Sequence, residues 1–285
     1  LADELGGRVV LIGSPAGEGG GGKVHLIDGG ALDGVDAAMM VHPAGSDLRR
    51  MDAIAVQQIL VEYHGEAAHA AAFPHLGRNA LDAAVLGYVN IAALRQHIRP
   101  DERIHGIFTR AGDRPNIVPA EAAAHYYVRA ADLAGLDALK PRVLACLEAG
   151  NAAAGTEMTY RWVDPAYADV RDNGPLGDRY IANAARLGRH VADVADVPVV
   201  GSTDMGNVSY VVPSIHPMIA AAPAHVAIHT PEFERCAAGE QGDAAVLDGA
   251  RALAMTIADL WLDPAALADA RAAFAADPSI AAARA

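Results

Sequence analysis

The residues best placed to do chemistry lie in one glycine-rich segment, Val9 to Lys23 (VVLIGSPAGEGGGGK). Its apolar start, Val9 to Ile12, predicts a buried strand. Gly17 to Lys23 fits the pattern G-x-x-x-x-G-K of a phosphate-binding loop. The carboxylate of Glu18 equally suits a metal site, because α/β proteins place functional groups at the carboxyl edge of their sheets.

The phosphate-binding interpretation lacks a necessary hydroxyl. Such a loop needs Ser or Thr directly after its lysine to hold magnesium, and Val24 stands at that position. No later apolar strand ends in a clear magnesium-binding aspartate. A nucleotide-binding protein therefore ranks third among the hypotheses for this chain.

Two histidines share the sequence context of Glu18. His42 follows the predicted strand Asp36 to Val41, and His229 precedes a long predicted helix in the sequence IHTPEF. Taken singly, a histidine is more often a surface or core residue than a ligand. These side chains all lie at strand or helix ends beside glycine- and proline-rich turns. Imidazole and carboxylate together suit zinc, cobalt or manganese, so the sequence favours a metal site over a phosphate site.

Two further segments contain polar candidates. GEAAHA (residues 65–70) places His69 just after a predicted strand, among more small residues than an ordinary hairpin needs. NIVP (residues 116–119) places Asn116 between two predicted strands. From the residues alone, a plain loop with a solvated histidine is the simpler interpretation.

The elements that must position these residues fall into two groups. Over roughly residues 54 to 164, two-residue alternation and helical spacing follow the order β-α-β-β-α-β, which is typical of a ferredoxin-like α+β domain. The strands are expected near 59–63, 103–109, 122–129 and 158–162, and the helices near 81–94 and 139–147. Exposed strand edges of such a domain are candidates for pairing with a second copy.

The flanking regions predict a different domain. Strands and helices alternate in residues 1–50 and 166–285, as in an α/β sheet. Helices are expected over 176–188 and from about 243 to 262, and a strand over 210–220 that Pro213 and Pro217 break. We therefore predict a partial α/β domain formed by residues 1–52 and 166–285, interrupted by an inserted domain at 53–165.

Composition excludes several classes of function. The formal net charge of −13 leaves no broad basic face, so we expect no nucleic-acid partner. There is no apolar run of about 18 residues and no leader-like start, so we expect no membrane span and a cytoplasmic protein. Two cysteines, Cys146 and Cys236, do not make a disulfide framework.

Together these segments resemble the carboxypeptidase- and aminoacylase-type amidohydrolases of the M20 metallopeptidase family. The resemblance is closest to its aminobenzoyl-glutamate hydrolase-like and aminoacylase-like branch and runs from about residue 8 to residue 262. Its markers are GSPAGEGGGGK, the HP of MMVHP, GEAAHAAAFPHLGRNALDA, NIVPAEAAAHYYVRA, GSTDMGNVSYVVPSIHP and HTPEF.

The resemblance implies a catalytic α/β domain with an inserted lid or dimerisation domain. It also implies two divalent metal ions, usually zinc, that bridge a water molecule attacking an amide carbonyl. Glu18, His42 and His229 match metal ligands of the family. They are fewer ligands than two metal ions need, so a complete two-metal centre is not expected.

The resemblance assigns further roles to lid residues. His69 matches a histidine that stabilises the tetrahedral oxyanion, often from the partner subunit. Asn116 and Arg129 match residues that hold the substrate, and Arg129 could grip a terminal carboxylate through a bidentate fork. A homodimer formed through the inserted domain and a small-molecule substrate are the implied partners.

Two departures from the family change the expected activity. Gly17 stands where relatives carry the glutamate that takes a proton from the metal-bound water. The family's catalytic domain also begins well upstream, with a loop that supplies the remaining ligands. We therefore expect a truncated or degenerate hydrolase of dipeptides or N-acyl amino acids, with weak or no activity alone. The alternative is a non-catalytic dimerising or small-ligand-binding relative that keeps Arg129.

Overall fold

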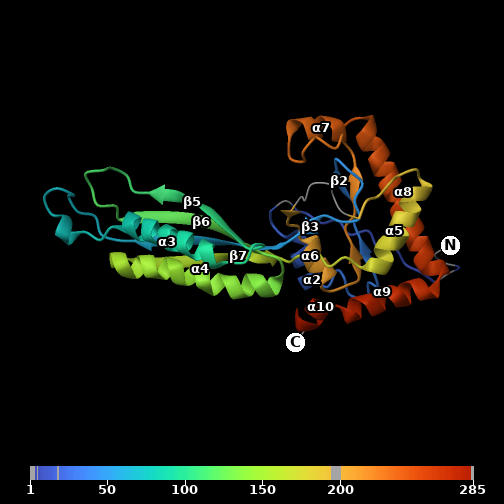
Figure 1. Ribbon diagram of the computed structural model, residues 1–285, viewed down its shortest axis with the longest axis horizontal. Coiled ribbons are helices and arrows are strands. Elements are labelled where there is room, and N and C mark those ends of the chain that lie inside the picture. The colour runs from blue at the N-terminus through green and yellow to red at the C-terminus, as the bar shows by residue number, and fades with distance from the viewer. Residues whose placement is uncertain (1–3, 5, 18, 194–199, 284–285) are drawn as a thin grey trace. The chain divides into compact units, whose positions relative to one another are not determined.

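The computed structural model describes residues 4, 6–17, 19–193 and 200–283 of the chain. The chain divides into two compact units. One unit is continuous, Ile54–Asp169, and the other combines Leu1–Ala53 with Val170–Ala285. Figure 1 labels most of the helices and several strands of both units.

The continuous unit is an antiparallel sheet with two helices on one face (Figure 1). Its main elements are β4 (Ala55–His64), α3 (Ala80–Leu94), β5 (Arg103–Ala111), β6 (Glu121–Ala130), α4 (Leu133–Ala154) and β7 (Glu157–Tyr167). Two short 3₁₀ helices, η1 (Pro74–Leu76) and η2 (Arg95–His97), flank α3. The strand order is β5-β6-β4-β7, which leaves β5 and β7 as edges. The elements predicted for this region are present in the expected order along the chain.

Two-residue alternation explains the faces of this sheet. On β4, Ile59, Val61 and Tyr63 are fully buried, and they belong to the core shared with the helices. The intervening side chains lie on the opposite, open face. Asn79 begins α3, because its side-chain oxygen accepts the backbone N–H of Leu81 at 2.9 Å.

Within its described residues, the discontinuous unit contains three parallel pairs of short strands. β1 (Ala38–Met39) pairs with β9 (Ser214–Ile215), β2 (His42–Ala44) with β10 (Met218–Ala220), and β3 (Asp52–Ala53) with β8 (Val200–Gly201). Its helices are α2 (Gly22–Asp28), α5 (Gly174–Arg186), α6 (Met205–Ser209), α7 (Pro231–Ala237), α8 (Glu240–Leu262), α9 (Pro264–Ala276) and α10 (Pro278–Ala283). Parallel strands with covering helices are typical of an α/β domain.

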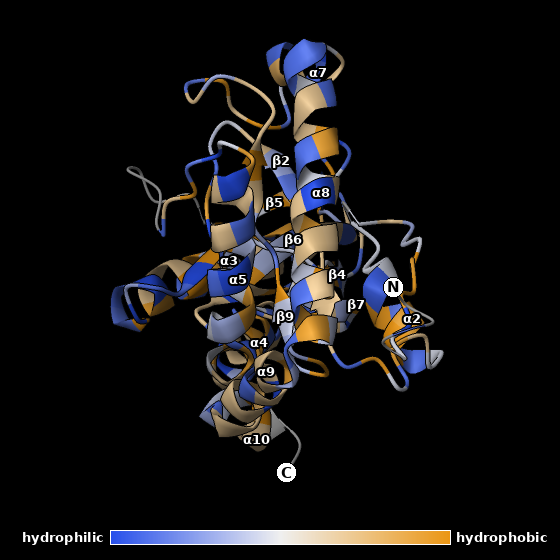
Figure 2. Cartoon of the chain, turned by 90° about the vertical axis from the view of Figure 1, so that its right-hand side faces the viewer, coloured by the Kyte–Doolittle hydropathy of each residue, from blue (hydrophilic) through white to orange (hydrophobic). Residues whose placement is uncertain are grey.

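The long helix α8 is amphipathic. Figure 2 shows hydrophilic and hydrophobic residues alternating in bands along it. Its buried positions recur every three or four residues and are all small side chains or Thr: Gly242, Ala245, Gly249, Ala252 and Thr256. Small residues at these positions let the helix pack closely; Gly249, for example, lies close to Val41 and Ile219.

The prediction of a buried strand at Val9 to Ile12 is wrong. These residues form no strand, and Leu11 is 97 % exposed. A strand is stabilised by ladder hydrogen bonds, and no strand in the described part of the chain pairs with this segment. The apolar side chains of Val9 to Ile12 therefore have no neighbouring strand among the described residues that would bury them.

The strand predicted over residues 210–220 is broken at Pro213 and Pro217, as expected, and is shorter than predicted. Tyr210 caps the end of α6, and only the short strands β9 and β10 follow. Pro213 and Pro217 lie immediately before these strands. Because proline cannot donate a ladder hydrogen bond, it separates short strands and does not continue a long one.

Candidate functional site

The glycine-rich loop makes a tight turn into α2. The backbone N–H of Gly20 donates to Ala16 O at 2.9 Å, and Gly21 has φ of 60°. A Cβ atom on Gly22 would lie 1.8 Å from Pro15 O, so only glycine fits there. The path of the backbone therefore favours glycine at position 21 and requires it at position 22.

Gly17 is a different case within this loop. A Cβ atom on Gly17 would lie 3.8 Å from Lys23 Nζ, which is an ordinary contact, so the fold leaves room for a side chain. The missing carboxylate at this position is a property of the sequence and is not imposed by the backbone. Glu18, the next residue and a predicted metal ligand, lies outside the described residues.

Lys23 is anchored to a buried carboxylate. Lys23 Nζ lies 2.8 Å from Asp204 Oδ1, and the backbone N–H of Lys23 donates to Asp204 Oδ2 at 3.1 Å. Asp204 is fully buried at the start of α6. The ammonium group is thus already paired with an anion, which weighs against the phosphate-binding hypothesis.

His42 is oriented as a metal ligand would be. It is the first residue of β2, and its Nδ1 lies 2.8 Å from Pro43 O. A carbonyl oxygen can only accept, so Nδ1 carries the proton in the neutral ring and Nε2 keeps its lone pair. Metal-binding histidines commonly use one ring nitrogen in this way to orient the other.

His216 lies beside His42, and the sequence did not single it out. The two rings stack with centroids 5.5 Å apart. His216 is 1 % exposed, and neither of its ring nitrogens has a hydrogen-bond partner among the described residues. Burial, with the nearby His42 and Lys23, lowers the pKa of His216 to about 3, so the ring is neutral. The only sequence signal was its place within the marker GSTDMGNVSYVVPSIHP.

His229, the third predicted ligand, is an exposed residue directly before α7. Its φ of 62° lies in the left-handed region, which is uncommon outside glycine. The next residue, Thr230, caps α7 by accepting the backbone N–H of Phe233 at 3.2 Å. Within the described residues, no three His, Cys, Asp or Glu side chains form a group that could hold a metal ion. The described chain therefore presents one oriented imidazole and not a complete metal site.

In the continuous unit, His69 is set up as a hydrogen-bond donor. Its Nδ1 accepts the backbone N–H of Ala72 at 3.1 Å and that of Ala71 at 3.3 Å. The proton of the neutral ring therefore lies on Nε2. Because the side chain is exposed, this N–H is available to a developing oxyanion.

His69 and Asn116 lie on paired backbone segments. The backbone N–H of Ala70 donates to Asn116 O at 3.0 Å, and that of Val118 donates to Ala68 O at 2.9 Å. The structure thus brings together two residues predicted to serve the lid, although about 45 residues separate them in the sequence.

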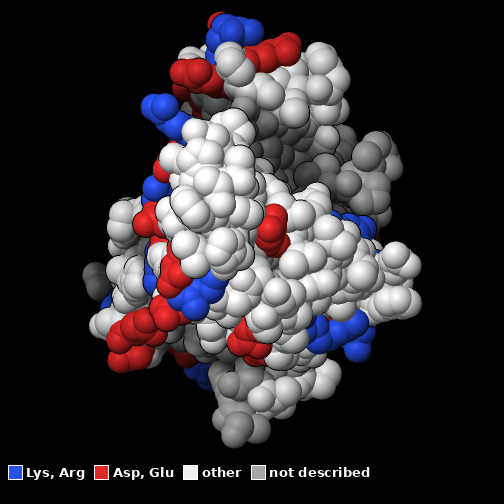
Figure 3. All heavy atoms as spheres, turned by 90° about the vertical axis from the view of Figure 1, so that its left-hand side faces the viewer, with Lys and Arg blue, Asp and Glu red and all other residues white. Residues whose placement is uncertain are grey.

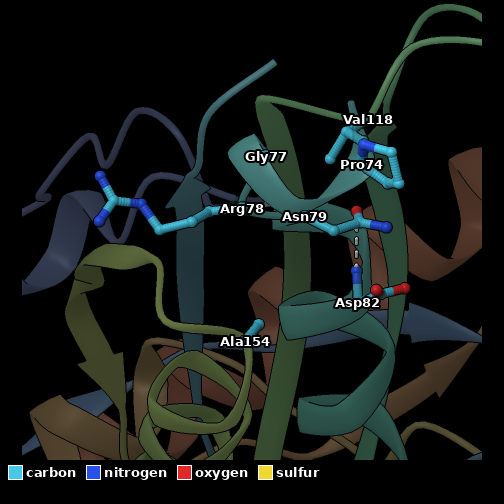
Figure 4. Close-up of a pocket in the computed structure, with 7 residues that line it drawn as sticks. All are labelled: Pro74, Gly77, Arg78, Asn79, Asp82, Val118 and Ala154. Carbon is cyan, nitrogen blue, oxygen red and sulfur yellow. Dashed lines mark hydrogen bonds between the residues drawn. The ribbon is translucent and has the colours of Figure 1, made fainter. Parts of the chain in front are cut away.

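A cavity of about 320 Å³ lies beside these paired segments (Figure 4). It is lined by Pro74, Gly77, Arg78, Asn79, Asp82, Val118 and Ala154. Asn79 uses its side-chain oxygen to cap α3, and Arg78, which points away from Asn79 and Val118 in Figure 4, pairs with Glu66. The side chains of Asn79 and Arg78 thus serve local structure, and we assign no reaction to this cavity.

Arg129 lies near the last residue of β6, at the end of the strand away from the loop that contains His69. It is paired with Val56 and Arg103, whereas Glu121, at the start of β6, is paired with His64. Eight residues of antiparallel strand span about 27 Å. The loop with His69 follows β4 at the Glu121 end, so one copy of the continuous unit does not bring His69 and Arg129 together.

The surroundings of Arg129 include residues that the sequence did not reveal. Its Nε donates to His105 Nε2 at 3.3 Å, and its guanidinium lies 5.7 Å from the ring centroid of Tyr127. Burial lowers the pKa of Arg129, partly opposed by Tyr127. His105 and Tyr127 alternate with core residues on β5 and β6, and this alternation was the one available sequence signal.

Residues 57–154 match the family model of the M20 peptidase dimerisation domain. The chain is 37 % identical over 270 residues to Xaa-Arg dipeptidase of Mus musculus, covering 94 % of this chain and 62 % of the relative. It is also 38 % identical over 156 residues to a subunit of p-aminobenzoyl-glutamate hydrolase of Escherichia coli (strain K12), covering 54 % and 32 %. The chain belongs to the M20 peptidase family. It spans about three fifths of the length of the dipeptidase.

Solved structures show the M20 fold as well. The aminobenzoyl-glutamate utilization protein from Klebsiella pneumoniae superposes with a TM-score of 0.62 at 24 % identity, covering 72 % of this chain and 55 % of that one. Bacillus subtilis YXEP, described as a dinuclear metal binding peptidase from the M20 family, gives 0.55 at 18 % identity, covering 84 % and 64 %. The resemblance stated from the sequence motifs is confirmed.

The charged side chains of this M20 chain can be followed on one face of its surface. On the face shown in Figure 3, acidic and basic side chains are interspersed, without a broad basic area. In the described part of the chain, no helix is long and apolar enough to cross a membrane.

Proposed function

We propose that this chain serves the hydrolysis of an amide bond in a small substrate, a dipeptide or an N-acyl amino acid. The observation that carries the proposal is the hydrogen bonding of His69, which leaves Nε2–H as an exposed donor for the oxyanion. The names of the relatives, a dipeptidase and an aminobenzoyl-glutamate hydrolase, support the same class of substrate.

Divalent metal is the cofactor that this function requires. Glu18, His42 and His229 would supply ligands to zinc, or to manganese or cobalt, and the metal would polarise the amide carbonyl and activate water. The Nδ1 hydrogen bond of His42 supports its part in this assignment. Asn116 and Arg129 are proposed to hold the substrate.

The continuous unit is proposed to be a ferredoxin-like lid that forms a homodimer. Its order of elements and its strand order β5-β6-β4-β7 support the topology. The separation of His69 and Arg129 along β6 supports the dimer, because a site that uses both residues needs His69 from a second copy.

Gly17 favours a second candidate, a small-ligand-binding relative without turnover. No side chain at this position can take a proton from the attacking water. We therefore propose weak or no hydrolysis by this chain in isolation.

Both candidates are tested by one experiment on the full chain dialysed against a small excess of zinc. Elemental analysis would give bound zinc per chain, and amino-acid release would be followed with dipeptides, including Xaa-Arg, and with N-acyl amino acids. Any turnover should be lost in His69→Ala and kept in His75→Ala, since His75 is another exposed histidine of the lid. Calorimetric titration of the same compounds would give substrate binding. Binding without turnover would favour the second candidate, and the absence of both would contradict both candidates.

A further inference from the structure

The open face of the lid sheet carries a cluster of stacked polar side chains. In the register of β5 and β6, His105 lies opposite Tyr127, and Arg103 lies opposite Arg129. Their strand neighbours, such as Ile104 and Val128, are buried towards the helices. Alternation therefore places His105, Tyr127 and Arg129 on the face that the helices leave open.

His105 and Tyr127 fix the position of the Arg129 side chain. Arg129 Nε can only donate, so His105 Nε2, at 3.3 Å, accepts and the neutral imidazole carries its proton on Nδ1. The rings of His105 and Tyr127 are nearly parallel, at 11° with centroids 5.6 Å apart. Tyr127 also lies within cation–π distance of the guanidinium. Arg129 is thus held by a hydrogen bond and by an aromatic face.

The charges in this cluster favour an anionic ligand. Arg103 stands opposite Arg129 on the neighbouring strand, and like charges in that position destabilise a sheet. His105 accepts a hydrogen bond from Arg129 and is neutral. A carboxylate partner would also accept this bond, but it would bring a negative charge. A histidine in this position orients a guanidinium and preserves its attraction for a carboxylate.

We propose that His105, stacked on Tyr127, is a positioning residue that sets the guanidinium of Arg129 for a carboxylate ligand on the open face of the lid sheet. The proposal rests on the substrate-binding role proposed above for Arg129. The ligand class is the free carboxylate of an N-acyl amino acid or a dipeptide.

The test measures binding without turnover. Hippurate (N-benzoylglycine) is titrated into the full chain in the presence of a metal chelator, and its uncharged amide serves as the control ligand. His105→Leu should weaken hippurate binding about ten-fold, whereas His105→Gln, which keeps an acceptor oxygen, should retain most of it. His125→Leu removes another histidine of the same face, one that bonds Gln58, and should leave binding within about two-fold.

A second readout does not depend on any ligand. Nitrogen-15 NMR of the imidazole should show the Nδ1–H tautomer for His105. Burial, Arg129 and Arg95 lower the pKa of His105. Protonation at acidic pH removes the acceptor for Arg129, so hippurate affinity should fall there. The charged and titratable groups that surround His105 are Arg103 on its own strand, Tyr127, Arg129 and His125 on β6, and Arg95 on η2.

The outcomes separate the two proposals. Equal hippurate binding by the unaltered chain and His105→Leu, with a loss in Arg129→Ala, would overturn the role of His105 and keep that of Arg129. Equal binding of hippurate and its amide, or no effect of Arg129→Ala, would overturn both.

An Nε2–H tautomer of His105 would overturn the positioning role whatever the titrations show. Loss of the acidic fall in affinity in His105→Gln would confirm that His105 is the titrating group.

Discussion

Lys23 and Asp204, 181 residues apart in the sequence, form a buried ion pair in which Nζ lies 2.8 Å from Oδ1. The same carboxylate also accepts the backbone N–H of Lys23. Asp204 therefore holds both the side chain and the main chain at the point where the glycine-rich loop becomes α2. This pair ties the loop to α6, far away in the sequence.

Removing one member of this pair should destabilise the protein strongly. Lys23→Met leaves a carboxylate that is fully buried, and we expect the free energy of unfolding to fall by about 3 to 5 kcal/mol. Urea unfolding followed by circular dichroism measures the change. The control is Glu121→Gln, which removes a half-exposed pair with Arg110 and should cost under about 1 kcal/mol. Similar losses in the two variants would show that Lys23 and Asp204 are not a structural anchor.

Replacing Gly17 by glutamate should not restore hydrolysis. The backbone accepts a side chain there, since a Cβ atom meets only Lys23 Nζ at 3.8 Å. A general base is useful only beside a complete metal site, and the described residues contain no group of three metal-binding side chains. Release of amino acids from dipeptides by Gly17→Glu, with bound zinc measured in parallel, checks this. Strong rescue by this single change would show that the ligand set is more complete than we infer.

The inserted unit was the most predictable part of the fold. Its strands alternate clearly between buried and open residues, and Asn79 and Gly155 mark a helix start and a helix end by local chemistry. Such signals depend on neighbours in the sequence, so they can be interpreted without the fold. The units seen in the structure meet at residues 53/54 and 169/170, and the sequence placed these limits at 52/53 and 165/166.

The discontinuous unit was less predictable, because its strands depend on distant partners. Val9 to Ile12 has the composition of a strand and forms none in the structure. In the candidate site, His42 and His69 were found through motifs, but the tautomer of each ring follows from hydrogen bonds that only the fold shows. His216 had no signal of its own, since nothing local distinguishes a buried histidine from a solvated one.

The stability of the metal-free protein should decrease at acidic pH because of His216. Its folded-state pKa, about 3, lies below the usual value near 6.5, so the unfolded chain binds the proton more tightly. This contribution is present above pH 6.5 and is lost as the pH falls towards 3, with a slope of at most about 1.4 kcal/mol per pH unit. Urea unfolding in chelator between pH 7 and 4 measures it.

The matched variant for this pH effect is His216→Leu, which keeps a buried side chain and removes the titrating group. Its pH dependence should be shallower than that of the unaltered chain. At pH 7 it should be as stable or nearly so, because the imidazole nitrogens it removes have no hydrogen-bond partner in the described part of the chain. Identical slopes in the two proteins would assign the acid sensitivity to other groups.

An apolar patch beside the β5 edge should form the interface between two copies of the chain. Val85, Tyr88 and Val89 share one face of α3 and are exposed, and the ring of Phe108 on β5 lies 5.8 Å from that of Tyr88. Exposed apolar side chains next to an unpaired strand edge are typical of a protein–protein contact. The match to a dimerisation domain covers these residues.

Val89→Glu should dissociate the proposed dimer into monomers, because it would bury a carboxylate without a partner within this patch. Sedimentation velocity at several protein concentrations measures the change. The control, Val246→Glu, places the same charge on α8 at a position that is 71 % exposed and in the other unit, so it should leave the dimer intact. A dimer that survives Val89→Glu, or one disrupted equally by Val246→Glu, would mean that the copies meet through another surface. In that case His69 of one copy could not be assigned to the Arg129 site of the other.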